Sequence, residues 1–196
     1  MTARTSTGSA TAAWPVVGDL VRLAALVSVA LALARYGWIG GALFALVLGG
    51  TVLPRALGAP AALDAAYSTT ILFAAWCAQL DVYLRVGWLD VVVHAAATGL
   101  VAAMVHLALV RVGAVAAVDD PAVRRPRLGS AVVTSALGLA LAVLWEFGEW
   151  WGHTQLDDRI QVGYTDTVGD LAAGLGGALV AAVLLARGVL LARRPA

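Results

Sequence analysis

The sequence is poor in charge and almost without cysteine. Only 13% of its 196 residues are charged and 61% are hydrophobic, whereas soluble globular domains have about 25% charged and 45 to 50% apolar residues. This balance, with a mean hydropathy of +0.88, excludes an ordinary water-soluble globule. The single cysteine, Cys77, excludes an intrachain disulfide and a Cys-based zinc cluster, and we expect it to be a small buried hydrophobe.

Lysine is absent, so all 13 basic residues are arginine, which we attribute to genomic base composition. The formal net charge of +1 carries no signature of nucleic-acid binding, so nucleic acid is excluded as a partner. The sequence has no Gly-rich phosphate loop, no Ser-His-Asp pattern and no nucleophile elbow. We therefore assign no residue to an organic cofactor.

Long apolar runs fill most of the chain. Because a helix needs about 20 apolar residues to cross a bilayer, we predict an all-α, polytopic transmembrane bundle of about six helices. The predicted spans are residues 20–34, 37–53, 62–80, 88–110, 130–151 and 165–186. They form a single transmembrane domain, 19–190, between a flexible N-terminal tail, 1–18, and a basic C-terminal tail, 191–196. We leave open whether the bundle is monomeric or self-associating.

Arginine placement predicts the orientation. With a cytoplasmic N-terminus, the outer segments hold only Arg35, Arg85 and Arg159, and all the other arginines fall on the inner side. Positive charge of this kind marks cytoplasmic segments, so we predict a multi-pass protein of the bacterial cytoplasmic (inner) membrane with both termini in the cytoplasm. Most tryptophans then lie near the outer interface, as amphipathic rings do.

Carboxylates and histidines recur at helical spacing near that outer face. Asp90 and His94 are four residues apart, as are Asp166 and Asp170, and each pair lies on one helix face. An ionisable group at membrane depth costs roughly 2.5 to 3.5 kcal/mol on insertion scales, so it normally faces the bundle interior and marks a site. The candidate metal ligands are Asp90, His94, Glu146, Glu149, Asp166 and Asp170, and the catalytic candidates among them are Glu146, Glu149, Asp166 and Asp170.

The stripe of Asp166 and Asp170 continues into the small residues Ala173 and Gly177, which allow close helix contact. Because the carboxylates and the small packing residues share one helix face, the carboxylates should point into the bundle. Several carboxylates in one dry pocket coexist only if some are protonated, paired with arginine or bridged by a cation. Oxygen ligands with imidazole suit a divalent metal. The alternative is a proton-sharing structural network, bonded to Arg85, Arg159, Gln155 or the indole N–H groups.

Three other polar residues have simpler explanations. Around the helix axis, His106 points more than about 100° away from the face that carries Asp90 and His94. We therefore expect it to be a packed histidine. Asp64 starts a span, where helix capping or pairing with Arg55 accounts for it. His153 continues the spacing of Glu146 and Glu149 only if the helix extends that far.

The sequence resembles the YjdF-type family of small bacterial inner-membrane proteins in three linked motifs. These are Asp90-Val91-Val92-Val93-His94, Trp145-Glu146-Phe147-Gly148-Glu149-Trp150-Trp151 and Asp166-Thr167-Val168-Gly169-Asp170. A fainter similarity to VanZ-like membrane proteins rests on the last motif and Gln155. The resemblance implies a shared site at these residues, with no activity attached.

Three functions fit these observations. The first is a metal-assisted enzyme that acts on a lipid or lipid-linked substrate, with one carboxylate spared as general base. The second is a cation- or proton-coupled transporter or channel component, in which the acids relay charge. The third is a non-catalytic partner subunit whose polar core is structural.

Overall fold

The computed structural model describes residues 8–190, with side chains from Trp14 onward. The predicted tail residues 1–7 and 191–196 lie outside this range. The described helices are α1 (Gly8–Ala56), α2 (Ala61–Gln79), α3 (Val82–Arg85), α4 (Gly87–Arg111), α5 (Pro126–Gln155) and α6 (Tyr164–Ala186), and no strand occurs among the described residues. All except the short α3 are long and apolar enough to cross a membrane. The prediction of an all-α membrane bundle is confirmed.

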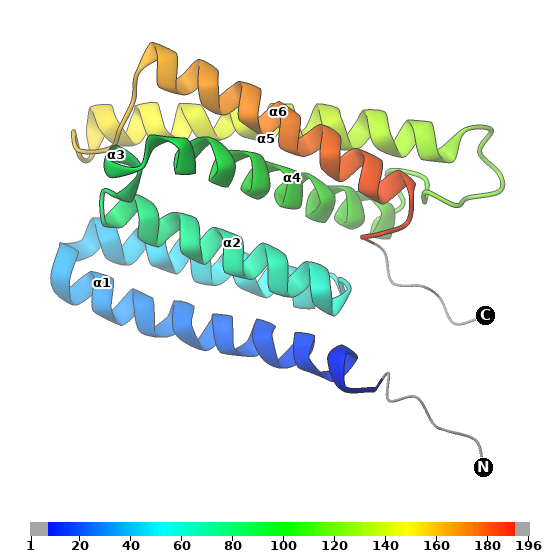
Figure 1. The fold of residues 1–196 in the computed structure, drawn as a ribbon, viewed down its shortest axis with the longest axis horizontal. Helices are drawn as coiled ribbons and strands as arrows, with labels where there is room; N and C mark the ends of the chain where they lie inside the picture. Colours follow the sequence, from blue (N-terminus) through cyan, green and yellow to red (C-terminus); the bar gives the residue numbers. More distant parts are fainter. Residues whose placement is uncertain (1–7, 191–196) are drawn as a thin grey trace. The chain divides into compact units, whose positions relative to one another are not determined.

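Helix α1 contains both of the first two predicted spans. Its backbone breaks at Gly37 (φ 76°, ψ −164°), a positive φ that glycine adopts without steric cost. Beyond the break the chain doubles back. Contacts between the two arms show this: Arg22 Nε donates to the Thr51 carbonyl at 2.8 Å, and Asp19 pairs with Arg55. In a straight helix Asp19 and Arg55 would lie about 54 Å apart. Figure 1 shows the two arms of α1 running side by side.

Several boundaries differ from the prediction. Helix α1 begins at Gly8, so residues 8–18, expected in the flexible tail, are helical, and their alanines favour this state. Helix α5 extends the predicted span 130–151 at both ends, and Pro126 suits its first turn because proline there loses no helical hydrogen bond. Helix α3 lies in a segment predicted as a break between spans.

The chain divides into two compact units, one through Ala75 and one from Trp76 onward. In the N-terminal unit a buried carboxylate, Asp64, accepts a hydrogen bond from Arg22 Nη2 at 2.5 Å and one from Ser68 Oγ at 3.1 Å. The expected pairing of Asp64 with Arg55 is wrong, because Arg55 pairs with Asp19 instead. The fold-back of α1 brings Arg22, rather than Arg55, to Asp64.

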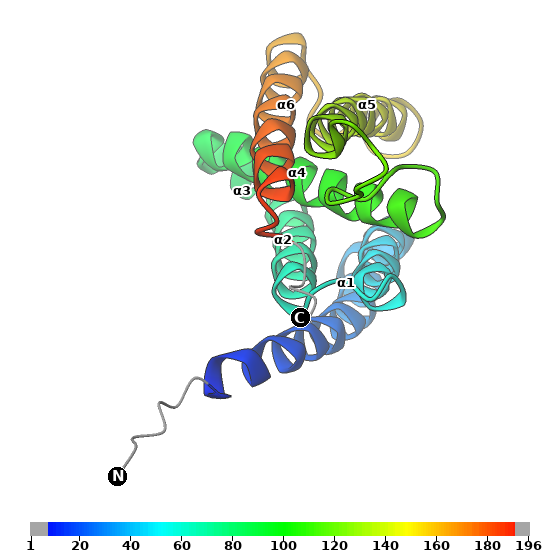
Figure 2. The ribbon, with the colours of Figure 1, turned by 90° about the vertical axis from the view of Figure 1, so that its right-hand side faces the viewer.

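In the C-terminal unit, α4, α5 and α6 pack on one another through small residues. A Cβ built on Gly177 of α6 would lie 1.8 Å from the Ala95 carbonyl oxygen of α4, and one built on Gly138 of α5 would lie 2.3 Å from Ala178 Cβ. Only glycine permits such close approach of the backbones. Figure 2 shows these three helices from the side where α4 ends and α5 begins.

Candidate functional site

The candidate site lies at the end of the C-terminal unit where α4 and α6 begin and α5 ends (Figure 1). The small-residue contacts lead directly to it. On α6, Asp170 is one turn before Gly174, whose Cβ position would meet Ala142 of α5 at 3.2 Å. On α5, Glu146 is one turn beyond Ala142. Close packing therefore brings acidic side chains from different helices together at one end of the unit.

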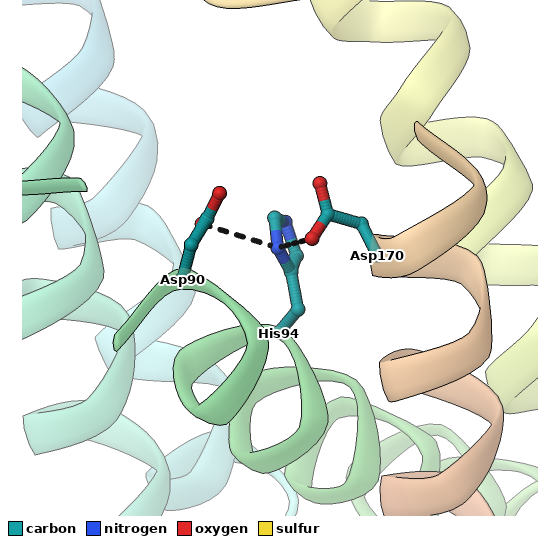
Figure 3. A group of neighbouring side chains, drawn as sticks. All are labelled: Asp90, His94 and Asp170. Carbon is teal, nitrogen blue, oxygen red and sulfur yellow. Dashed lines mark ion pairs between the residues drawn. The ribbon is translucent and has the colours of Figure 1, made fainter. Parts of the chain in front are cut away.

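The best-defined group is Asp90, His94 and Asp170, drawn in Figure 3. His94 Nδ1 lies 2.8 Å from Asp170 Oδ1 and 3.3 Å from Asp90 Oδ1, and the side chain of Asp170 is only 5% exposed. Despite these distances, His94 Nδ1 has no partner with hydrogen-bond geometry. One imidazole nitrogen and carboxylate oxygens from two helices thus converge on a small space.

A second group shares the same histidine. His94, Glu146 and Glu149 each place one ligand atom within 4.8 Å of the others, as do the residues of the first group. The structure therefore brings together five of the six predicted ligands, with four carboxylates around the imidazole of His94, and carboxylates with imidazole are the donor set of a divalent metal site.

The sixth predicted residue, Asp166, belongs to neither group but lines the adjacent pocket. This pocket has a volume of about 350 Å³. Its lining residues are Gly87, Asp90, Val91, Gln161, Thr165, Asp166, Gly169 and Asp170. Gln161 Nε2 donates to Asp166 Oδ1 at 3.2 Å. The sequence did not indicate Gln161, because its contact with the helix depends on the fold of the loop before α6.

The two arginines expected to pair with the cluster, Arg85 and Arg159, are bonded to other groups. Arg85 Nη2 donates to the Leu80 carbonyl at 2.7 Å, and Arg159 Nη2 pairs with Asp157 Oδ2 at 2.7 Å. The hydrogen bond from Arg159 lowers the pKa of Asp157 below its usual value. The expected bonding of Arg85 or Arg159 to the buried carboxylates is absent among the described residues.

Tyr83, between α2 and α4, is a neighbour that sequence reasoning missed. Burial raises its pKa above the ordinary value of 10.0, and Cys77, Asp90, Glu149 and Asp170 raise it further. The phenol therefore stays protonated at neutral pH and can donate a hydrogen bond. No spacing rule links Tyr83 to the motifs, because it lies in the short helix α3, separate from the helices that carry them.

The two remaining histidines lie outside both ligand groups. His153 places Nδ1 2.6 Å from the Ile160 carbonyl oxygen, so it fastens the loop between α5 and α6. His106 is 2% exposed, in agreement with the expectation of a packed histidine, although its Nδ1 has no hydrogen-bond partner.

Comparison with known proteins agrees with the membrane fold. Residues 16–189 match the model of a family described as "Predicted membrane protein (DUF2238)". No curated protein and no solved structure matches the chain. The resemblance to YjdF-type proteins is consistent with the family match, whereas similarity to VanZ-like proteins is not shown. Because the match covers nearly the whole chain, this protein belongs to the DUF2238 family of predicted membrane proteins.

Proposed function

We propose that the C-terminal unit is a divalent-metal-dependent membrane enzyme acting on a lipid or lipid-linked substrate. The observation that carries the proposal is the convergence of Asp90, His94 and Asp170, with Glu146 and Glu149, from three helices. Up to four carboxylates surround a single imidazole there, and the nearby arginines are bonded elsewhere. A bound cation would offset this excess of negative charge.

The pocket supports a separate role for Asp166. Since it lies outside both ligand groups yet lines the same pocket as Asp90 and Asp170, it is the carboxylate available as general base. Gln161 orients it through the 3.2 Å hydrogen bond. A divalent cation held by the other residues would supply Lewis-acid chemistry at the pocket, and Asp166 would be placed to accept a proton there.

The surroundings of the pocket favour a lipid as the substrate. Trp88, Trp150, Trp151 and Tyr164, at the same end of the unit, are 68%, 55%, 53% and 88% exposed. Exposed tryptophan and tyrosine on apolar helices are typical of the headgroup level of a bilayer. A pocket at that depth is within reach of a headgroup.

Packing beneath the cluster supports an enzyme over a transporter. Transport needs a continuous polar route, yet the next contacts along the helices are Gly177 with Ala95 and Gly138 with Ala178, which are too close to admit a water-filled path. The acidic cluster therefore adjoins a pocket at one end of the unit and is backed by closely packed helices.

Elemental analysis of detergent-purified protein tests the proposal. We expect at least about one divalent ion per chain in the wild type. Glu149→Gln or His94→Gln should lower the affinity for that ion at least about tenfold. Asp158→Asn is the matched control, because this exposed acid lies outside both groups. Chelation should lower the melting temperature of the wild type and of the control alike.

Two results would count against the proposal. If purified protein carries no stoichiometric metal and chelation leaves its melting temperature unchanged, the site is not a metal centre. If Glu149→Gln lowers stability without changing metal affinity, the polar core is structural, as in a non-catalytic partner subunit.

A further inference from the structure

We infer that the loop between α4 and α5 binds the headgroup of an anionic phospholipid, at a site separate from the acidic cluster. The loop, residues 112–125, lies at the opposite end of the C-terminal unit (Figure 1). It forms a pocket of about 570 Å³. The lining residues are Val118, Asp119, Asp120, Pro121, Val123, Arg125, Pro126, Arg127 and Leu128.

The pocket combines positive charge with apolar surface. Arg125 and Arg127 line it, and Arg124 adjoins them. None of these three exposed arginines forms an ion pair with a described residue. By contrast, Arg22, Arg55 and Arg159 are all paired. Arginines left without a protein partner beside an apolar helix are suited to anionic lipid headgroups.

The apolar part of the lining matches the rest of a phospholipid. Val123 and Leu128 are 39% and 54% exposed, whereas Val118 is buried. A ligand with a phosphate next to acyl chains satisfies both halves of the pocket, because the phosphate pairs with guanidinium groups and the chains cover Val123 and Leu128. A free inorganic anion would leave the apolar half uncovered.

The two acids in the lining oppose anion binding to different degrees. Asp120 Oδ1 accepts a hydrogen bond from the Ala122 N–H at 2.9 Å, so its carboxylate holds the turn of the loop. Asp119 is exposed and has no such contact among the described residues. It is therefore the residue whose neutralisation should strengthen the binding of an anionic headgroup.

Native mass spectrometry of protein released from mixed micelles of phosphatidylglycerol and phosphatidylcholine tests this inference. The wild type should retain phosphatidylglycerol in preference to phosphatidylcholine. A basic residue near an anionic surface contributes roughly fivefold to affinity, so Arg125→Gln with Arg127→Gln should weaken retention on the order of tenfold or more. Asp119→Asn should change it in the opposite direction.

The matched control removes two positive charges at the other end of the unit. Arg85→Gln with Arg159→Gln should leave the preference unchanged, and the acidic cluster is untouched in both double variants. Retention by the wild type should also fall as ionic strength rises, a test that stands even if the pocket variant folds poorly. The metal content of the purified protein is an independent readout, so either proposal can fail alone.

Three results would overturn the inference. These are equal retention of the two lipids by the wild type, equal losses in the pocket and control variants, and binding of inorganic phosphate by delipidated protein with the same dependence on Arg125 and Arg127. The last result would indicate a general anion site in place of a lipid site.

Discussion

At the scale of single residues, His94 is the centre of the site. It is the only residue shared by both groups of potential ligands among the described residues. Asp170 reaches it from a different helix at 2.8 Å, whereas Asp90 reaches it from one turn away on α4 at 3.3 Å. Substitution of His94 should therefore affect both groups, and substitution of a carboxylate should affect one.

The contrast between Asp166 and Asp170 provides a direct test of their roles. We expect Asp166→Asn to retain bound metal but lose most activity on lipid, because Asp166 lies outside both ligand groups. Asp170→Asn should lower metal affinity roughly tenfold or more. Metal titration of the two variants in the same detergent distinguishes them, and equal metal loss in both would contradict the assignment of Asp166.

The loop between α5 and α6 should respond to acid through one ion pair. The pKa of Asp157 is lowered by Arg159, so the pair stabilises the loop above the ordinary pKa of 3.8 and is lost as pH falls through the lowered value. The protection factors of residues 156–163 against hydrogen exchange, which are corrected for the intrinsic pH dependence of the rate, should then fall at low pH. Asp157→Asn should show low protection factors at all pH values, and a persistent pH dependence of these factors in that variant would contradict this cause.

At the scale of helices, the positions of the acids depend on close contact between α4 and α6. Gly99 and Gly177 meet so closely that a Cβ on Gly99 would lie 2.6 Å from the Gly177 carbonyl oxygen. Asp170 is two turns from Gly177 on the same helix. Any separation of the two helices at the glycines moves Asp170 away from His94.

Adjacent glycines on α6 give a matched pair of variants. Gly177→Ala should destabilise the protein by about 1 to 3 kcal/mol, because its Cβ position is 1.8 Å from the Ala95 carbonyl oxygen. Gly176→Ala should be neutral or stabilise by up to about 1 kcal/mol, because nothing lies within 4 Å of its Cβ position. Thermal unfolding in detergent measures both, and equal melting temperatures would refute the close contact.

Most of the helical pattern could be predicted from the sequence. Apolar runs and arginine placement depend on local composition, so the spans near α2, α4 and α6 differ from the helices by no more than one residue at each end. Helix α1 was harder, because a merely apolar segment does not show whether a glycine bends the chain. The turn at Gly37 lies where the sequence predicted a break between two spans. The helical state of residues 8–18 was not predicted.

The site was predictable where helical spacing determines it. Asp90 with His94, and Glu146 with Glu149, share a face because of the helical repeat. The contact of Asp170 with His94 depends on how α4 and α6 cross, which only the stripe of small residues indicated. Gln161 lies in the loop before α6 and Tyr83 in the four-residue helix α3, so no periodicity relates either residue to the cluster. The partner of Asp64 was wrong for the same reason, because it depends on the fold-back of α1.

At the scale of the whole molecule, the chain is a membrane-integral helical protein. The side of the membrane on which the acidic site opens remains a prediction from arginine placement. The loop pocket and the acidic cluster lie at opposite ends of the C-terminal unit. If the unit crosses the bilayer, the loop pocket faces one leaflet and the acidic cluster faces the other.

Cysteine labelling in intact cells tests the orientation. The native Cys77 is buried, so it should react slowly with an impermeant maleimide. Asp158→Cys, in the loop between α5 and α6, should be labelled from outside. Asp119→Cys, in the loop between α4 and α5, should be labelled only after the membrane is opened. The reverse pattern would place the acidic site in the cytoplasm.

The direction of the three helices has one more consequence for the acidic cluster. Asp90 and Asp166 lie in the first turns of α4 and α6, where the positive end of the helix macrodipole favours negative charge. Glu146 and Glu149 lie more than one turn before the end of α5, beyond the terminal turn to which the macrodipole effect is confined. The backbone therefore supports the negative charge of Asp90 and Asp166, and gives no such support to Glu146 and Glu149.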